Sequence, residues 1–466
     1  MFQQNNLKGQ LDHTFPKPKQ MKRLLTYIFV IGGLTTATNA HAQASEEPSE
    51  KRGKQGFTLG VLPAVAYDAD LGFQYGLLTN LYWYGDGSRY PKYDHSLYLE
   101  ASRFKAGTTL LRAYYDSPQL IPNYRTTVDL TWFNDLTMDF YGFNGHQAKF
   151  NHQFEDENHP DYISRVFYKH ERKMLRGMVN IKKPLHEGSP WHWQAGAVVF
   201  NMDIAPVDTE HLNKGNDKPL PDTQELYEKY VEWGLISEKE KNGGFNPYLK
   251  GGIGYDSRDK ESFASEGIWT EVLWAYAPGF LSSNNYDYGK ITFYHRQYIN
   301  LSKKKLVFAY RLGWQHKLWG KTPFYLLPHW NTSVLTSATS QGLGGGKTLR
   351  GIRRNRVVGD GSVMANVELR YLFHEFNLFN QNISLGTNVF GDFGYITQKY
   401  KTDLSNVPEQ EKALHFNQQE DQPHYSAGAG FKAAMNENFI LSIEYGKSLK
   451  KSDGESGFYI TMNYLF

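Results

Sequence analysis

A two-residue alternation of apolar and polar side chains recurs along this chain, and it constrains the fold more than any other feature of the sequence. In the segment 362–373, apolar residues occupy the odd positions, whereas Asn366, Glu368 and Arg370 share the opposite face. The last segment, 457–466, gathers apolar residues on one face: Phe458, Ile460, Met462, Tyr464 and Phe466. Such alternation indicates β-strands, because successive side chains of a strand point to opposite faces.

Segments with this character follow one another to the last residue. We identify sixteen, near 57–67, 71–84, 93–105, 107–116, 124–135, 163–185, 190–203, 246–257, 267–277, 286–299, 304–317, 362–374, 381–397, 423–434, 438–448 and 457–466. One external connection, 204–245, also contains a short helical pattern in which Leu226, Tyr230 and Trp233 share a face. The pattern predicts an all-β fold.

Two kinds of β-protein fit the composition. After the first 42 residues no apolar run reaches the ~20 residues that a membrane-spanning helix needs, and the mean hydropathy is −0.59. Aromatic residues make up 15% of the chain, however, and apolar faces recur at almost every strand. A barrel with lipid outside and a polar lumen inside requires such apolar faces and many aromatic residues. We therefore expect a transmembrane antiparallel β-barrel of about 16 strands rather than a soluble sandwich.

The connections between the predicted strands are unequal in length. The long ones are 136–162, 204–245, 318–361 and 398–422, and each follows an odd-numbered strand. All four must then lie at the same end of the barrel. Outer-membrane barrels show this asymmetry, with short periplasmic turns and long external loops.

The N-terminal residues predict export. Residues 1–42 contain a positive stretch at Met21–Arg23, an apolar stretch at 24–34 and a small-x-small cleavage pattern at 40–42. These features indicate a leader with a secretory signal peptide that starts at Met21. We expect 43–56 to be a short periplasmic tether and 57–466 to be the outer-membrane barrel.

Charge and cysteine content exclude several classes. The leader carries five basic residues and one acid, which leaves 46 basic and 47 acidic residues in the rest of the chain. No basic domain remains for nucleic acid. The absence of cysteine excludes disulfides and a lipidated cysteine.

One loop resembles a phosphate-binding motif. The stretch 342–356 reads GLGGGKTLRGIRRNR, but position 341 is Gln where a P-loop requires glycine. A strand pattern rather than a helix follows it, so the backbone N–H groups of a helix terminus are not available. We therefore interpret the stretch as structural.

Four motifs together resemble the BamA/TamA superfamily of outer-membrane barrels. Leu349–Ile352 is similar to its hydrophobic-Arg-Gly-aromatic loop motif, and Tyr255–Asp259 to its Tyr-Asp-x-Arg-Asp signature, carried by Tyr255, Asp256, Arg258 and Asp259. Pro323–Tyr325 and Gly391–Gly394 match in the same order along the chain. The resemblance implies a barrel in the cell outer membrane that acts in protein insertion, secretion or assembly.

Two departures qualify that resemblance. Ile352 stands where the family has an aromatic residue, and 43–56 is too short for a polypeptide-transport-associated (POTRA) domain. We therefore expect a stand-alone barrel of the surface-antigen type. Outer-membrane lipid, separate periplasmic or outer-membrane protein partners, and a monomeric barrel follow from this interpretation. A passive channel or receptor that keeps the fold is the main alternative, and an outer-membrane enzyme is the weaker one.

The basic loop offers the candidate site. If it folds into the lumen, Arg350 next to Gly351 lies near Glu368 and Asp392, which alternation places on the lumen side. An Arg held by two carboxylates makes a geometrically selective contact, which we term the luminal loop lock. A solvated external basic loop is the alternative.

Two other groups of residues remain. Tyr464 and Phe466, on the lipid face of the last strand, are predicted to form the barrel's own assembly signal. One acidic loop contains His146, His152 and His159. Two interpretations of these histidines remain, ordinary solvation and incidental metal binding. The sequence contains no cofactor, catalytic or metal motif, so we predict no cofactor and no enzymatic activity.

Overall fold

The computed structural model describes residues 55–90, 92–105, 107–215, 217–261, 264–303, 305–335, 342–378, 381–435, 439–462 and 465–466. The predicted leader, 1–42, and residues 43–54 of the predicted tether lie outside these ranges. Among the described residues, no helix has the length and apolar character needed to cross a membrane.

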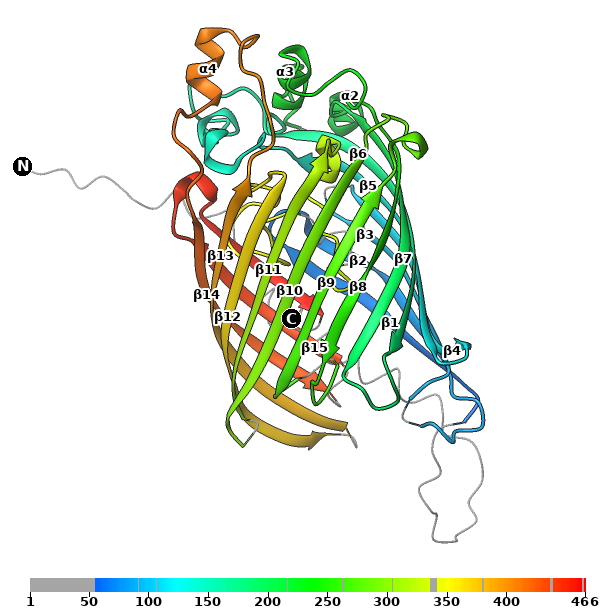
Figure 1. Ribbon diagram of the computed structural model, residues 1–466. Coiled ribbons are helices and arrows are strands. Elements are labelled where there is room, and N and C mark those ends of the chain that lie inside the picture. The colour runs from blue at the N-terminus through cyan, green and yellow to red at the C-terminus, as the bar shows by residue number, and fades with distance from the viewer. Residues whose placement is uncertain are drawn as a thin grey trace, which may run out of the picture.

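Sixteen antiparallel strands close into one barrel (Figure 1), as predicted. They are β1 (Phe57–Asp68), β2 (Gly72–Trp83), β3 (His95–Phe104), β4 (Thr109–Ile121), β5 (Tyr124–Asp139), β6 (Lys169–Pro184), β7 (Trp191–Ala205), β8 (Gly243–Asp256), β9 (Gly267–Ala277), β10 (Tyr288–Ser302), β11 (Leu306–Gly320), β12 (Gly361–Leu378), β13 (Gln381–Gln398), β14 (His424–Met435), β15 (Phe439–Ser448) and β16 (Ser456–Met462). Each strand pairs with its sequence neighbour, and β1 pairs with β16.

Alternation along each strand separates the two faces of the wall. On β6, Leu175 and Val179 point outward and are about half exposed, whereas Arg176 and Met178 point inward and are buried. The outer face is therefore apolar and the lumen is lined with charged and polar groups. Such a surface suits a wall in lipid, and the closed ladder satisfies the backbone polar groups without water.

The long connections gather at one end of the barrel, the loop end, and carry its helices (Figure 1). The helices are α2 (Thr209–Asn213), α3 (Leu226–Glu232) and α4 (Glu409–His415). α3 begins after Glu225, which forms a capping box with Glu228. Aromatic side chains of these loops pack into one buried cluster that includes Phe140, Tyr230 and Phe324. The loop end is thus capped by its own hydrophobic core.

Two strand boundaries differ from the prediction. β6 begins at Lys169 instead of near 163, because Phe167 and Tyr168 belong to the buried cluster of the cap. β16 ends at Met462 instead of at Phe466. The last described residues, 465–466, have left the wall and lie inside the barrel, where the C-terminus is seen in Figure 1.

Candidate functional site

The loop between β11 and β12 enters the lumen and places Arg350 at its centre. The Arg350 side chain is fully buried. Its Nη1 lies 2.6 Å from Glu368 Oε1, and its Nη2 lies 2.8 Å from Asp392 Oδ1. Arg350 Nε and the backbone N–H both donate to Asp392 Oδ2, at 3.0 and 2.9 Å. Asp392 thus receives a bidentate fork from Arg350, which fixes the loop in position and in rotation.

Sequence reasoning missed a third carboxylate. Arg350 Nη1 also lies 2.9 Å from Glu444 Oε1 on β15. Two further cations complete the group, with Arg370 2.8 Å from Glu368 and Lys432 2.8 Å from Glu444. Three cations therefore balance three carboxylates. The alternating pattern of β15 marks Glu444 as a lumen residue, but only the closed barrel brings it to Arg350.

Gly351 allows the loop to lie directly on the wall. Its φ is +90°, a conformation that side chains disfavour. A Cβ on Gly351 would lie 2.6 Å from the carbonyl carbon of Gly446 on β15. The Gly351 N–H donates to the Tyr459 hydroxyl of β16 at 3.0 Å. The close approach of these two glycines sets the loop against β15 and β16.

The remaining arginines of the loop hold its outer part. Arg354 reaches two carboxylates of β5, at 3.0 Å from Asp135 and 2.8 Å from Asp139. Arg356 donates to three backbone carbonyls of the cap: Gly145, Ala148 and Ser452, at 2.9–3.0 Å. The loop is therefore held at both sides of the lumen.

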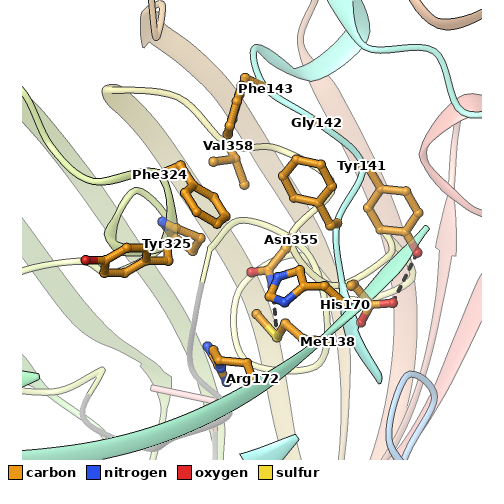
Figure 2. A pocket seen from close by; sticks show the side chains of 13 residues that line it. Met138, Tyr141, Gly142, Phe143, His170, Arg172, Phe324, Tyr325, Asn355 and Val358 are labelled. Atoms are coloured by element: carbon orange, nitrogen blue, oxygen red, sulfur yellow. Dashed lines mark hydrogen bonds between the residues drawn. The ribbon is translucent and has the colours of Figure 1, made fainter. Parts of the chain in front are cut away.

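Aromatic side chains fill the lumen above the loop. Figure 2 shows Tyr141, Phe143, Phe324 and His170 around Asn355 of the loop. The cavity that remains between them is about 30 Å³, which leaves room for only a few water molecules. The outer lumen is thus packed rather than open.

The predicted family signature forms a turn that holds its own shape. Tyr255 and Asp256 end β8, and Arg258 makes a bidentate contact with Asp256 at 2.9 and 2.8 Å. Asp259 accepts from the N–H and hydroxyl of Ser265 at 2.9 and 2.6 Å. These residues shape the β8–β9 turn, at the end of the barrel opposite the loop end, and they do not contact Arg350.

The junction between β1 and β16, which we call the seam, has fewer registered pairs than any other junction among the described residues. Among the described residues only one pair is in register across it, Tyr67 with Ile460. The other edge of β1 is paired with β2 along its whole length, from Phe57 to Asp68. The edge of β1 over residues 57–66 has no registered partner in the described part of β16.

The end of the chain explains part of this difference. The sequence predicted Phe466 on the lipid face, but this prediction is wrong. Phe466 is buried against Tyr298, Val307 and Ala309 on the opposite wall. The guanidinium groups of Arg311 and Arg370 lie 5.2 and 4.8 Å from the centre of its ring. Cation–π contacts and apolar burial together favour the inward position. Tyr464 lies outside the described residues.

A cavity of about 350 Å³ opens beside the seam. Residues of β1, β16 and the loop line it, including Ala66, Lys347 and Met462. The seam therefore borders free volume instead of packed side chains.

A closed antiparallel barrel with a buried arginine-anchored loop defines an outer-membrane type of transport or assembly barrel. The chain belongs to the Omp85 superfamily, whose domain model matches residues 96–466. A search of the curated proteins gave no significant match.

Solved structures show the same fold. BamA from Haemophilus ducreyi lacking POTRA domains 1–3 is 16% identical, with a TM-score of 0.54 over 88% of this chain and 70% of that chain. CdiB from Escherichia coli is 8% identical, with a TM-score of 0.50 over 93% of this chain and 69% of that chain.

Proposed function

We propose that this chain resides in the outer membrane and assists the insertion, assembly or secretion of other proteins by parting β1 from β16. The observation that carries the proposal is the seam, where a single registered pair joins the described residues of two strands. Membership of the Omp85 superfamily supports the same role.

The physical basis is the exposed strand edge. Backbone N–H and C=O groups without partners are costly in lipid, where water cannot replace them. An incoming β-strand that pairs with residues 57–66 of β1 would satisfy these groups, as strand addition does at other sheet edges. The substrate class is therefore a polypeptide that presents an extended, partly apolar segment.

The luminal loop acts as a brace across the seam. Gly351 binds Tyr459 on β16, while a Cβ on Gly346 would lie 3.3 Å from Asp68 at the end of β1. The loop thus contacts both seam strands, and Arg350 ties it to β12, β13 and β15. Release of the loop would remove a support from both edges.

No part of this mechanism requires a catalytic group or cofactor, and we propose a non-enzymatic barrel. Its partners are outer-membrane lipid and, for delivery of the substrate, separate periplasmic or outer-membrane proteins. The barrel itself is proposed to act as a monomer.

A cysteine lock tests the proposal, because the chain has no native cysteine. Tyr67→Cys with Ile460→Cys joins the registered pair of the seam. Val65→Cys with Tyr75→Cys joins β1 to β2 and serves as the matched control. Insertion of a test barrel into proteoliposomes, or growth of a depletion strain, should fail only when the seam pair is oxidised, and reduction should restore it.

A passive channel gives the opposite result. Full activity with the seam locked would overturn lateral opening, and large, steady single-channel conductance would then favour the channel. The packed lumen argues for small openings instead.

A further inference from the structure

Two histidines and two aspartates from separate loops meet at the loop end of the barrel. His146 comes from the β5–β6 loop and His424 begins β14, while Asp421 and Asp453 come from the β13–β14 and β15–β16 loops. His424 and Asp453 are fully buried, Asp421 is almost so, and His146 is 13% exposed. The sequence separation of the two histidines is 278 residues, so no linear motif could reveal them.

Three ligand atoms converge on one side of this group. Asp421 Oδ1 lies 3.3 Å from His146 Nδ1 and 3.1 Å from His424 Nε2. Zinc binds imidazole nitrogen and carboxylate oxygen at about 2.0–2.2 Å, so two such ligands at the tetrahedral angle are about 3.3 Å apart. The two rings stack with their centres 4.1 Å apart and their planes 6° from parallel, so one ring has to turn for both nitrogens to bind a single ion beside Asp421.

Asp453 lies on the other side of both rings. Its Oδ1 is 3.1 Å from His146 Nε2, and its Oδ2 is 2.9 Å from His424 Nδ1. The nitrogens that face away from Asp421 therefore both reach one carboxylate. This is the arrangement in which a second carboxylate orients histidine ligands and raises their basicity.

The surrounding backbone is shaped to bring the ligands together. Asp421 accepts from the backbone N–H groups of His146 and Ile396, at 2.9 and 3.2 Å, which aims its carboxylate. At Gly145, φ is +56° and a Cβ would lie 2.2 Å from Asp421 Oδ1. Only glycine lets the loop come this close. Arg356, 3.8 Å from Asp453, is held by backbone carbonyls and partly offsets the negative charge.

We propose that His146, His424 and Asp421 form a binding site for a divalent transition metal of the zinc class, with Asp453 as a positioning residue. The metal would join the β5–β6 loop to the β13–β14 loop and the start of β14, above the luminal loop, and Asp453 would add a contact from the β15–β16 loop. Imidazole nitrogen selects zinc and its neighbours over magnesium and calcium, which prefer oxygen ligands. This inference concerns the cap and is independent of seam opening.

The test is zinc binding by the full chain in detergent after treatment with a chelator and dialysis. Isothermal titration should give one Zn²⁺ per chain, and Co²⁺ in its place should show the visible absorption of a tetrahedral site. His424→Gln and His146→Gln should each weaken binding by more than about 100-fold, since even partners of the ligands contribute 10–100-fold. Asp453→Asn should fall within that smaller range.

His152→Gln is the matched control, because His152 lies in the same loop as His146 but outside the group. It should bind zinc like the unaltered chain. Heat-modifiable gel mobility checks that each variant forms a barrel, and zinc should slow protease cleavage of 399–423 only where the site is intact.

Three results would overturn the site. The first is no zinc binding by the unaltered chain, and the second is zinc binding by His424→Gln and His146→Gln that is as tight as in the unaltered chain. The third is Ca²⁺ binding that is as tight as Zn²⁺ binding and survives both histidine changes.

Discussion

The wall between β12 and β13 and the seam between β1 and β16 belong to one barrel but are held in different ways. β12 and β13 stay paired from Gly361 with Gln398 to Leu378 with Gln381, interrupted only by two register shifts. The seam has one registered pair among the described residues. On the lumen side, β12 and β13 each supply a carboxylate to Arg350. The seam strands meet the same loop through a hydroxyl and through close approach.

This difference shows how one barrel can be both anchored and able to open. Buried ion pairs resist the removal of either partner, because an unpaired buried charge is costly. A neutral hydrogen bond, such as that between Gly351 and Tyr459, can be exchanged for one to another strand at small net cost. Changes at four positions of the chain test this contrast, from the largest expected effect to the smallest.

Arg350→Ala should release the loop from the anchored wall. It leaves Glu368, Asp392 and Glu444 with one cation fewer in a fully buried group, and breaking such a pair costs about 3–5 kcal/mol. The barrel should still form, but protease added from outside should cut between Gly342 and Arg356, and conductance should rise.

Arg350→Lys should protect the loop from protease only in part, because an ammonium group cannot make the bidentate contact with Asp392. Arg353→Ala is the control, since Arg353 is 29% exposed and 3.7 Å from Glu155. If Arg350→Ala is no more sensitive to protease than Arg353→Ala, the lock does not hold the loop.

Phe466→Ala should loosen the seam side. A buried Phe→Ala change costs about 3–5 kcal/mol in a core, and the end of a chain can relax, so we expect about 2–3 kcal/mol. The freed tail should raise the exposure of β1, measured by labelling of an introduced cysteine, Val61→Cys, with a membrane-side thiol-reactive probe. Phe431→Ala, on the outer face of β14 and away from the seam, should change this exposure little.

Barrel abundance separates two roles of Phe466. If Phe466→Ala lowers outer-membrane levels and raises periplasmic degradation, the residue is an assembly signal, as the sequence predicted. Normal levels together with increased seam exposure would show that it acts in the folded barrel as an internal latch. Unchanged levels and unchanged exposure would exclude both.

Gly351→Ala should strain the contact between the loop and β15. The new Cβ would lie 2.6 Å from Gly446 in a backbone conformation with φ of +90°, which costs about 1–3 kcal/mol. Gly60→Ala on β1 is the matched control, because its Cβ would meet nothing closer than 3.8 Å. Equal thermal stability of the two variants would mean that the close approach of Gly351 carries no strain.

Asp70, which follows β1 and accepts from the Arg354 N–H of the luminal loop, should make the stability of the folded chain depend on pH. Burial, followed by the nearby charges of Asp68 and Asp139, raises the pKa of Asp70 to about 7, against the opposing effect of Arg354. The folded chain then holds a proton that the unfolded chain releases near pH 4, so stability falls as pH rises from about 4 to about 7.

Asp70→Asn should remove this dependence because an amide does not titrate, and its oxygen can still accept from the Arg354 N–H, which keeps the local contact. Chemical denaturation of both proteins at pH 5 and pH 8 measures it. A difference between the two pH values that persists in Asp70→Asn would assign the effect to another group.

Much of the wall follows from the sequence alone. Alternation of side chains is a local property, so it located all sixteen strands and assigned Glu368 and Asp392 to the lumen. The spacing between strands placed every long connection at one end of the barrel. The glycines and arginines of 342–356 identified the loop. Alternation identified Glu368 on β12 and Asp392 on β13 as the acids that face it.

Only the tertiary structure decided which distant residues meet. Closure of the barrel brings Glu444 and Tyr459 under the loop, although no pattern links them to Arg350. Alternation extended β16 to Phe466, but burial against the opposite wall and the two guanidinium groups draws that residue inward. The cap likewise joins His146 to His424 instead of to its sequence neighbours. A local pattern fixes the side of the wall on which a residue lies, whereas its partners across the lumen depend on how the whole chain closes.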